Sequence, residues 1–448
     1  MPRSQAARAR SPGRDITTDI AGATLPLSTP SDLDPLIDAI GDSRFVLLGE
    51  ASHGTSEFYT WRAELSKRLI QEKQFSFIGV EGDWPDCYAV NRFVKGYDNS
   101  GESAADVLHR FDRWPTWMWA NREIVSLAEW MRAHNRKLPA EQKAGFYGLD
   151  VYSLWESMAA VVQYLEGVDP TFAQQARRAY TCFEPYAEDV QEYARATAMV
   201  PTSCEDETVA VLRALRARAP EFREDGREAY FNAEQNALVA RGAELYYRTM
   251  VRGGPTSWNV RDHHMVDTLN RLMLHHGDQA RAIVWEHNTH IGDARFTDMA
   301  RAGMVNVGQL VRQEHETDGV MLAGFATHHG TVIAGGEWGA PMERMRVPNA
   351  RDGSVEDLLH RATGGANALM MFDGSDNGGI EGFDQPLPNR AIGVVYDPRA
   401  ERFGNYVPTI VPRRYDALLY IDETHAVDPL HMPVHVSGEE PETYPSGM

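Results

Sequence analysis

The sequence predicts an α/β protein with a central, mainly parallel sheet flanked by helices and an inserted helical bundle acting as a cap over the carboxyl ends of the strands. Short apolar runs recur along the chain and end at glycine, carboxylate or histidine residues, which is typical of buried parallel strands. Between residues 153 and 277 the hydrophobic pattern is almost wholly helical. This block therefore predicts an insertion between strands of one α/β unit.

The first strand is expected at residues 45–49, and a helix is expected to begin at Thr55 or Ser56. Apolar residues at helical spacing continue that helix, and a second strand at residues 75–80 follows. Strand, helix and strand in this length form a parallel, right-handed βαβ unit. Further strands are expected at 145–149, 281–285, 320–325, 391–396 and 417–421.

These elements divide the chain into five parts. The polar ends are expected to be disordered or loose, and the helical block separates two halves of the α/β core. The parts are a disordered N-terminal segment (1–20), the first part of the core (21–152), the helical insertion (153–277), the second part of the core (278–430) and a C-terminal tail (431–448).

Charge and composition narrow the class of partner. The 448 residues carry a formal net charge of −20, which disfavours nucleic acid and anionic membranes. A small neutral or cationic substrate fits this charge better. The three cysteines, Cys87, Cys182 and Cys204, are widely spaced, and their odd number is typical of a reducing compartment. With no signal-like apolar region near the start, the chain is expected to be cytoplasmic.

Residues 49–54, which follow the first strand, place a carboxylate and an imidazole between two glycines. Glu50 lies three residues before His53, and such a pair can activate water because the carboxylate orients the imidazole and stabilises its cation. Glu81 ends the second strand in the same way. Asp83 or Asp86, by contrast, is expected to cap the following helix.

His287 and His290 follow another strand in the order H-x-x-H. Two histidines three residues apart can share a helix face and bind a metal, although the H-E-x-x-H order of metalloproteases is missing. Arg62, two turns into the first helix, is a candidate for an oxyanion or a substrate carboxylate, or else for a surface salt bridge. We expect structural or rim positions, rather than ligand positions, for the pairs His263–His264 and His328–His329.

Several familiar catalytic motifs are missing from the sequence. No G-x-S-x-G nucleophile elbow, phosphate-binding G-x-x-x-x-G-K-[ST] loop or G-x-G-x-x-G fingerprint occurs. Their absence disfavours serine hydrolases of the usual α/β type and P-loop enzymes. It favours hydrolysis by a directly activated water. Trp114, Trp117 and Trp119 could line an apolar cleft or pack against the helical block.

At these positions the chain resembles the erythromycin esterase family. The likeness spans roughly residues 30 to 430, and its most specific segments are G-E-A-S-H-G and E-H-N-T-H. Other segments in the same order also resemble the family. They are Val80–Asp83, Gly148–Tyr152, Asn259–Asp262, Tyr415–Leu418 and Asp422–Thr424.

The resemblance implies an ester or lactone hydrolase in which His53 is the base that activates water. Glu50, Arg62, Glu81, His287 and His290 are then implied as the rest of the catalytic site. We expect Glu50 to orient His53, and His287 and Arg62 to stabilise the oxyanion. Glu81 and His290 would position water or the other rings.

Two alternatives stay open at this point. Members of the wider superfamily use metals or haem, so a divalent metal bound by the same Glu and His residues is possible, although no cofactor is expected. A non-catalytic binding or regulatory protein with the same fold is the other alternative. The expected partner is a small-molecule ester or lactone, and the sequence leaves the oligomeric state open.

Overall fold

The computed structural model describes residues 16–186, 190–199, 203–251, 253–375 and 378–431. Within these residues a nine-stranded sheet has the order β1-β8-β11-β6-β2-β5-β3-β4, and β7 pairs with β6. A separate pair of strands, β9 and β10, is antiparallel. The strands are β1 (Thr24–Pro26), β2 (Phe45–Leu48), β3 (Phe77–Val80), β4 (Gly145–Gly148), β5 (Ala282–Trp285), β6 (Val320–Gly335), β7 (Met342–Val347), β8 (Ala368–Met371), β9 (Leu387–Arg390), β10 (Tyr406–Thr409) and β11 (Ala417–Thr424).

The mainly parallel sheet of the prediction is present. Strands β11, β6, β2, β5, β3 and β4 run parallel to one another, whereas β1, β8 and β7 join the sheet by antiparallel pairing. β5 lies between β2 and β3, so the two strands of the first βαβ unit are not direct neighbours. In register, Leu48 and Val80 both pair with Trp285, so the strands end at one level. The residues that follow them therefore meet at one edge of the sheet.

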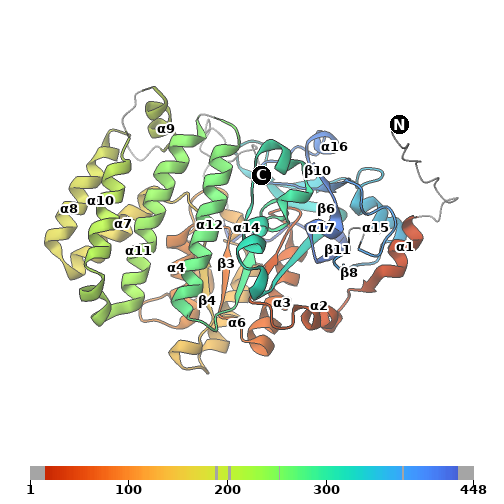
Figure 1. The fold of residues 1–448 in the computed structure, drawn as a ribbon, viewed down its shortest axis with the longest axis horizontal. Helices are drawn as coiled ribbons and strands as arrows, with labels where there is room; N and C mark the ends of the chain where they lie inside the picture. Colours follow the sequence, from red (N-terminus) through yellow and green to blue (C-terminus); the bar gives the residue numbers. More distant parts are fainter. Residues whose placement is uncertain (1–15, 187–189, 200–202, 252, 376–377, 432–448) are drawn as a thin grey trace, which may run out of the picture.

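The sheet is buried on both faces because helices cover both sides (Figure 1). Val46 and Leu48 belong to one hydrophobic core, whereas Phe45 and Leu47 belong to the other, as the two-residue side-chain period of a strand requires. The helices are α1 (Ile16–Ala23), α2 (Asp34–Ile40), α3 (Ser56–Lys73), α4 (Trp84–Lys95), α5 (Ala104–Leu108), α6 (Arg122–Asn135), α7 (Leu154–Val168), α8 (Pro170–Tyr180), α9 (Val190–Met199), α10 (Glu205–Ala217), α11 (Ala219–Met250), α12 (Pro255–His276), α13 (Asn288–Ile291), α14 (Val307–Glu314), α15 (Val355–Thr363), α16 (Glu401–Gly404) and α17 (Val411–Arg414).

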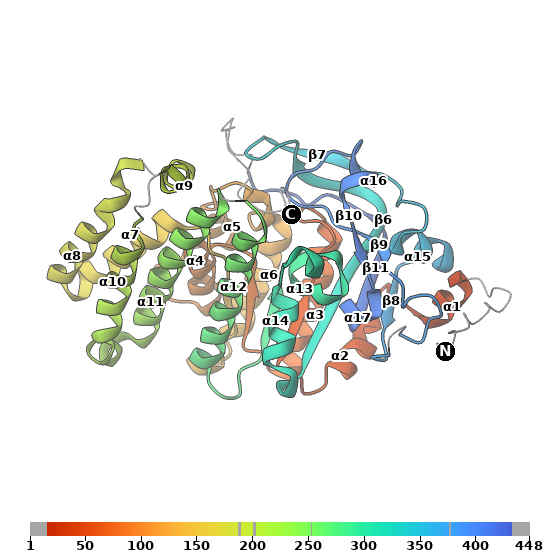
Figure 2. The same ribbon diagram turned by 45° about the horizontal axis from the view of Figure 1, so that its top comes forward.

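The predicted helical insertion is present as α7 to α12, and it has a hydrophobic core of its own. Figures 1 and 2 show helices α7 to α11 at one side of the molecule, beyond α4 and the β4 edge of the sheet. The bundle thus extends the molecule sideways more than it covers the strand ends. The difference arises because α11 packs on α7, α10 and α12, and reaches the α/β core through α4.

A disulfide joins Cys182 and Cys204 inside this bundle, with Cα atoms 5.9 Å apart. Cys87 is buried and is the free cysteine among the described residues. The odd cysteine count predicts a reducing compartment, whereas a disulfide is typical of an oxidising one. Among the described residues, no helix combines the length and the apolar character needed to cross a lipid bilayer.

Several predicted boundaries differ from the structure. Ile16–Ala23 is a helix with Ile20 buried, so residues 16–20 do not belong to a disordered segment. β6 continues to Gly335, ten residues past its expected end, because β11 and then β7 supply hydrogen-bonding partners. Residues 1–15 and the tail from residue 432 onward lie outside the described residues.

The predicted strand at residues 391–396 is wrong. The ladder lies earlier in the chain, at β9, and residues 391–396 make only isolated bridges. Ile392 donates its backbone N–H to Ala51 (2.8 Å) and Tyr396 donates to Gly335 (2.9 Å). This segment therefore runs over the carboxyl edge of the sheet instead of joining it.

Candidate active site

Backbone hydrogen bonds join the loops that follow the parallel strands. Asn288 donates to the Glu50 carbonyl oxygen (2.9 Å), and Glu81 donates to the Trp285 carbonyl oxygen (2.9 Å). The Glu81 side chain adds a further bond, because its Oε2 accepts from the backbone N–H of His287 at 2.9 Å. Glu50, Glu81 and His287 therefore share one frame, as the strand order predicts.

Glu50 and His53 form a buried pair under this edge. His53 Nδ1 lies 2.9 Å from Glu50 Oε1, and both side chains are 2% exposed. Because a carboxylate only accepts hydrogen bonds, this contact places the proton of the neutral imidazole on Nδ1. Nε2 is then left as the base. Tyr59 fixes the loop by donating its hydroxyl to the His53 carbonyl oxygen (2.7 Å).

The two glycines around this pair have a packing reason. A Cβ at Gly54 would lie 2.0 Å from the Ile333 carbonyl oxygen, and one at Gly49 would lie 2.0 Å from Asn288 Oδ1. Glycine thus lets the loop lie directly against β6 and α13. The Ile333 N–H also bonds the Gly54 carbonyl oxygen at 3.0 Å. His53 is therefore held by backbone on both sides.

Arg62 lies behind Glu50 and is fully buried. Its Nη2 donates to Glu50 Oε2 at 2.6 Å, and its guanidinium carbon lies 4.7 Å from the centre of the Trp285 ring. Arg62 does not line the cavity described below. Because Arg62 lies away from the cavity, its position does not fit the predicted contact with a substrate oxyanion. Because it is fully buried, it does not form a surface salt bridge either. Arg62 instead holds the Glu50 carboxylate in place.

A second buried network surrounds Arg261, which comes from α12. Arg261 Nη2 lies 2.6 Å from Glu81 Oε1 and 2.7 Å from Asp150 Oδ2, and its Nε bonds Asp150 Oδ1 at 2.9 Å. Although burial opposes it, the charges of His290 and Arg261 lower the pKa of Glu81 well below its usual range. Glu81 is therefore an anion held by a cation.

His290 belongs to this second network and not to the cavity. Its Nδ1 lies 2.9 Å from Asp262 Oδ1, its Nε2 lies 3.1 Å from Arg261 Nη1, and its ring stacks on Trp258 with centroids 4.4 Å apart. Both ring nitrogens are thus engaged. The predicted role of positioning other groups fits His290, whereas direct contact with a water in the cavity does not.

His287 lies beside His53, with ring centroids 4.8 Å apart. Its Nδ1 accepts the backbone N–H of Thr289 at 3.3 Å, which places the ring proton on Nε2. Burial, together with the neighbouring His53 charge, lowers the pKa of His287 well below its usual value, so the ring is neutral. Nε2 is buried and lacks a hydrogen-bond partner among the described residues. His287 therefore offers an unused N–H beside the base.

Glu286 is the buried carboxyl of this edge that no cation neutralises directly. Neither of its oxygens has a hydrogen-bond partner in the described part of the chain. Burial, and then the charges of Glu81 and Asp262, raise the pKa of Glu286 well above its usual value. The buried site therefore favours the neutral, protonated form of Glu286.

His53 lines a cavity whose empty space, including the part that is open to solvent, is about 660 Å³. Glu81, Asp150 and Arg261 form its polar floor. Its walls are mostly apolar and come from the loop before α6 and from the segments around residues 338 and 394. The apolar wall residues are Phe111, Trp114, Pro115, Met118, Trp119, Trp338 and Val394.

Two of the three predicted tryptophans line the cavity. Trp114 and Trp119 are wall residues, whereas Trp117 is buried in the core next to Trp114. Trp119 donates its indole N–H to the Glu81 carbonyl oxygen at 3.0 Å, which ties the wall to the floor. Arg261, from α12 of the helical insertion, and Tyr152, from the segment just before the insertion, also line the cavity. The loop before α6 therefore supplies most of the apolar wall of this cavity.

Two further carboxyls line the cavity at the start of α4. Asp83 is the N-terminal cap residue, but its Oδ2 pairs with Arg113 Nη1 at 3.1 Å instead of capping the helix. Burial raises the pKa of Asp83 to about 6, although Arg113 opposes the shift. Burial and the neighbouring Asp83 charge raise the pKa of Asp86 to about 7. This side of the cavity gains negative charge near neutral pH.

The predicted metal ligands do not converge in this arrangement. His53, His290 and Glu81 bond to other residues of the two networks, as described above. Among the described residues, the acidic and histidine side chains whose ligand atoms converge are a different group, His328, His329 and Asp422. Asp150, Arg261 and Asp262 were missed as site residues, although all three lie in segments that resemble the family.

Known proteins resemble this chain in sequence and in fold. The sequence profile of the family described as erythromycin esterase matches residues 70–424. The chain is similar to the "Erythromycin esterase type II" of Escherichia coli, with 21% identity over 364 residues, which cover 76% of this chain and 83% of that protein.

Three solved structures are similar in fold. One is described as a succinoglycan biosynthesis protein (TM-score 0.74, 21% identity, 92% of this chain and 97% of that chain). The second is a Bacillus cereus protein (TM-score 0.73, 16% identity, 93% and 98%). The third is a variant of the erythromycin esterase EreC in its open conformation (TM-score 0.65, 17% identity, 89% and 95%). With the profile matching most of its length, this chain belongs to the erythromycin esterase family.

Proposed function

We propose that this protein hydrolyses a carboxylic ester or lactone with a water activated by His53, without a serine nucleophile. The observation that carries the proposal is the Glu50–His53 pair, which lies under a mainly apolar cavity with Nδ1 engaged by Glu50. The family assignment supports a hydrolase of ester bonds at the level of reaction class.

The proton transfers of the proposed reaction follow from this pair. His53 Nε2 takes a proton from water, and the water oxygen forms a bond to the carbonyl carbon of the substrate. Glu50, accepting from Nδ1–H, stabilises the imidazolium, and Arg62 keeps the carboxylate in position. The C–O bond of the ester then breaks, and the leaving alkoxide takes the proton from His53. The products are a carboxylic acid and an alcohol.

The negative charge on the carbonyl oxygen needs a donor that is already oriented. We assign this task to Arg261, with the neutral ring of His287 beside His53 as a neighbour that does not itself line the cavity. Arg261 lines the cavity floor and supplies positive charge nearby. This assignment replaces the predicted role of Arg62, whose buried position supports orientation of Glu50 instead.

The cavity walls support a substrate with a large apolar part. Tryptophan and other apolar side chains provide that surface, and hydrogen-bonding groups lie on the floor. Asp83 and Asp86 add negative charge, which favours a neutral or amine-bearing substrate over an anionic one. A macrolide lactone, as the name of the Escherichia coli relative suggests, combines these properties.

The test is turnover of a panel of amine-bearing and neutral macrolides and simpler lactones, followed by mass spectrometry, with and without EDTA. Wild type should add one water to at least one compound, and His53→Gln should not. Asp34→Asn, a surface substitution that removes one partner of Arg68, is the matched control and should behave as wild type. Loss of activity in EDTA would replace this proposal with a metal-dependent one. No turnover across the panel by folded protein would favour a binding role.

A further inference from the structure

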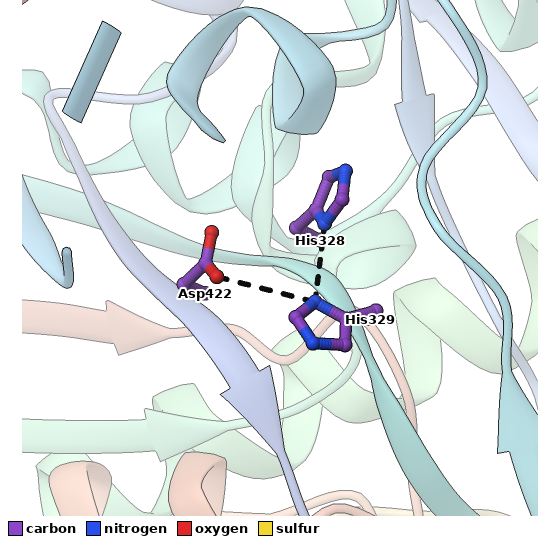
Figure 3. Close-up of side chains that lie close together, drawn as sticks. All are labelled: His328, His329 and Asp422. Carbon is purple, nitrogen blue, oxygen red and sulfur yellow. Dashed lines mark hydrogen bonds and ion pairs between the residues drawn. The ribbon is translucent and has the colours of Figure 1, made fainter. Parts of the chain in front are cut away.

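A second group of histidine and carboxylate side chains lies away from the cavity. His328 and His329 are on β6 and Asp422 is on the neighbouring parallel strand β11. Figure 3 shows the three side chains converging on one point between the strands. None of them lines the cavity above His53. The sequence alone favoured structural or rim positions for this histidine pair.

The two histidines are arranged unusually for neighbours in a strand. Successive side chains of a regular strand point to opposite faces, yet the Nδ1 atoms of His328 and His329 lie 3.1 Å apart. Asp422 Oδ2 lies 3.9 Å from His329 Nδ1. All three ligand atoms fall within 4.8 Å of one another.

The separation of the two histidine nitrogens matches what a small metal ion needs, and the Asp422 oxygen lies slightly farther away. With bonds of about 2.0–2.1 Å to nitrogen or oxygen, ligand atoms of a tetrahedral ion lie about 3.3 Å apart. We propose that His328, His329 and Asp422 bind a divalent transition metal ion of the zinc class. Two imidazoles and one carboxylate suit zinc, cobalt or nickel better than calcium or magnesium, which prefer oxygen ligands.

A surrounding layer of contacts orients the carboxylate. His360, from α15, places Nδ1 2.7 Å from Asp422 Oδ1, and the Tyr420 hydroxyl donates to the same oxygen. Oδ1 is therefore occupied, while Oδ2 faces the histidines. Gly365 leaves room beside this second oxygen, because a Cβ there would lie 3.4 Å from it. Such outer partners are typical of metal-binding carboxylates and histidines.

The group is partly accessible from solvent. The side chain of His329 is 33% exposed, whereas that of Asp422 is 10% exposed. An ion can therefore enter from the His329 side, and water can complete its coordination there. Because two of the three ligands lie on one strand and the third on its hydrogen-bonded neighbour, the bound ion would tie β6 to β11.

The test is calorimetric titration of the full-length chain with ZnCl₂ at pH 7.5, after removal of any affinity tag and chelator treatment. Wild type should bind one equivalent at this group and melt at a higher temperature with zinc, because the ion binds the folded state. His329→Gln and Asp422→Asn should remove that equivalent, and His360→Ala should weaken it about 10- to 100-fold. Co²⁺ should give visible absorption bands in wild type that are missing in His329→Gln.

Two controls separate this site from other sources of binding. His425→Gln changes a largely exposed histidine that pairs with Glu57, and it should keep the zinc equivalent. His53→Gln should also keep it, even though hydrolysis is lost. Loss of the equivalent in His53→Gln, its persistence in both His329→Gln and Asp422→Asn, or no binding by wild type would overturn the proposal. Melting of the zinc-free variants near the wild-type temperature verifies that they fold.

Discussion

His53 and His290 have the same kind of contact at Nδ1 but different surroundings for the rest of the ring. Each has Nδ1 2.9 Å from a carboxylate oxygen, that of Glu50 for His53 and that of Asp262 for His290. Each is almost fully buried. His53, however, lines the cavity, whereas His290 Nε2 faces Arg261 at 3.1 Å and its ring stacks on Trp258.

The difference separates the histidine that we propose as the base from one that holds a buried network together. A carboxylate on Nδ1 fixes the tautomer in both residues, so the carboxylate–imidazole pair is not in itself a sign of catalysis. The environment of Nε2 decides whether the histidine is free to act as a base. In His53 it is left for a substrate or water, and in His290 it completes a buried network around Arg261.

The largest expected effect tests the base. His53→Gln keeps the size and polarity of the side chain but removes the proton acceptor, so kcat should fall about 10²- to 10⁴-fold. The melting temperature should stay close to that of wild type. His290→Gln should instead lower the melting temperature, because it disrupts contacts with Asp262 and Arg261. A folded His290→Gln variant with the same kcat loss as His53→Gln would break the comparison.

The next effect tests the network around His290. Arg261→Met leaves the buried carboxylates of Glu81 and Asp150 without their cation, and should reduce the free energy of unfolding by about 3–5 kcal/mol. Urea titration measures this loss. Arg177→Met removes an exposed ion pair with Glu166 and should change stability by less than about 1 kcal/mol. Equal losses of unfolding free energy in the two variants would show that the buried network stabilises the protein no more than an exposed ion pair does.

A smaller effect concerns Glu286, the carboxyl that lacks a partner in both networks. Its pKa is raised in the folded protein, so folding favours the protonated form, and the stability cost grows as pH rises above the unfolded value of about 4.3. Glu286→Gln removes this cost. It should raise stability by about 1 kcal/mol at pH 8 and by little at pH 4.5, measured by thermal melts across pH. A gain that is independent of pH would contradict the explanation.

The smallest effect concerns the acidic side of the cavity. Asp86 has a pKa of about 7 and Asp83 one of about 6, so both are mostly neutral at pH 5.5 and charged at pH 8. The KM of a permanently cationic ester should therefore fall a few-fold over this range. Asp86→Asn should flatten the upper part of that change. The KM of a neutral ester serves as the control and should not follow the same curve.

Much of the candidate site can be predicted from the residues at the ends of the strands. Apolar runs that stop at Glu50, Glu81 and Glu286 identify buried strands, and parallel strands bring their carboxyl ends together. The helix after His53 begins at Ser56, one of the two predicted start positions. Local pattern was sufficient here because each signal lies within a few residues of the element that it marks.

Other features depend on contacts between distant segments. Arg261 lies 180 residues after Glu81, and only the packing of α12 over the sheet brings the two together. The length of β6 depends on its partners β11 and β7, and residues 391–396 cross the sheet edge without forming a strand. The position of the helical insertion beside the sheet likewise depends on α4.

The sequence by itself determined the α/β class, the parallel strands and the Glu50–His53 pair, because hydrophobic periodicity and short spacings are local properties of the chain. Only the tertiary structure decided which histidine lines the cavity, that Arg62 contacts Glu50, and that His328, His329 and Asp422 converge. Those outcomes depend on side chains from separate elements, whose distances are set when the sheet and its helices pack.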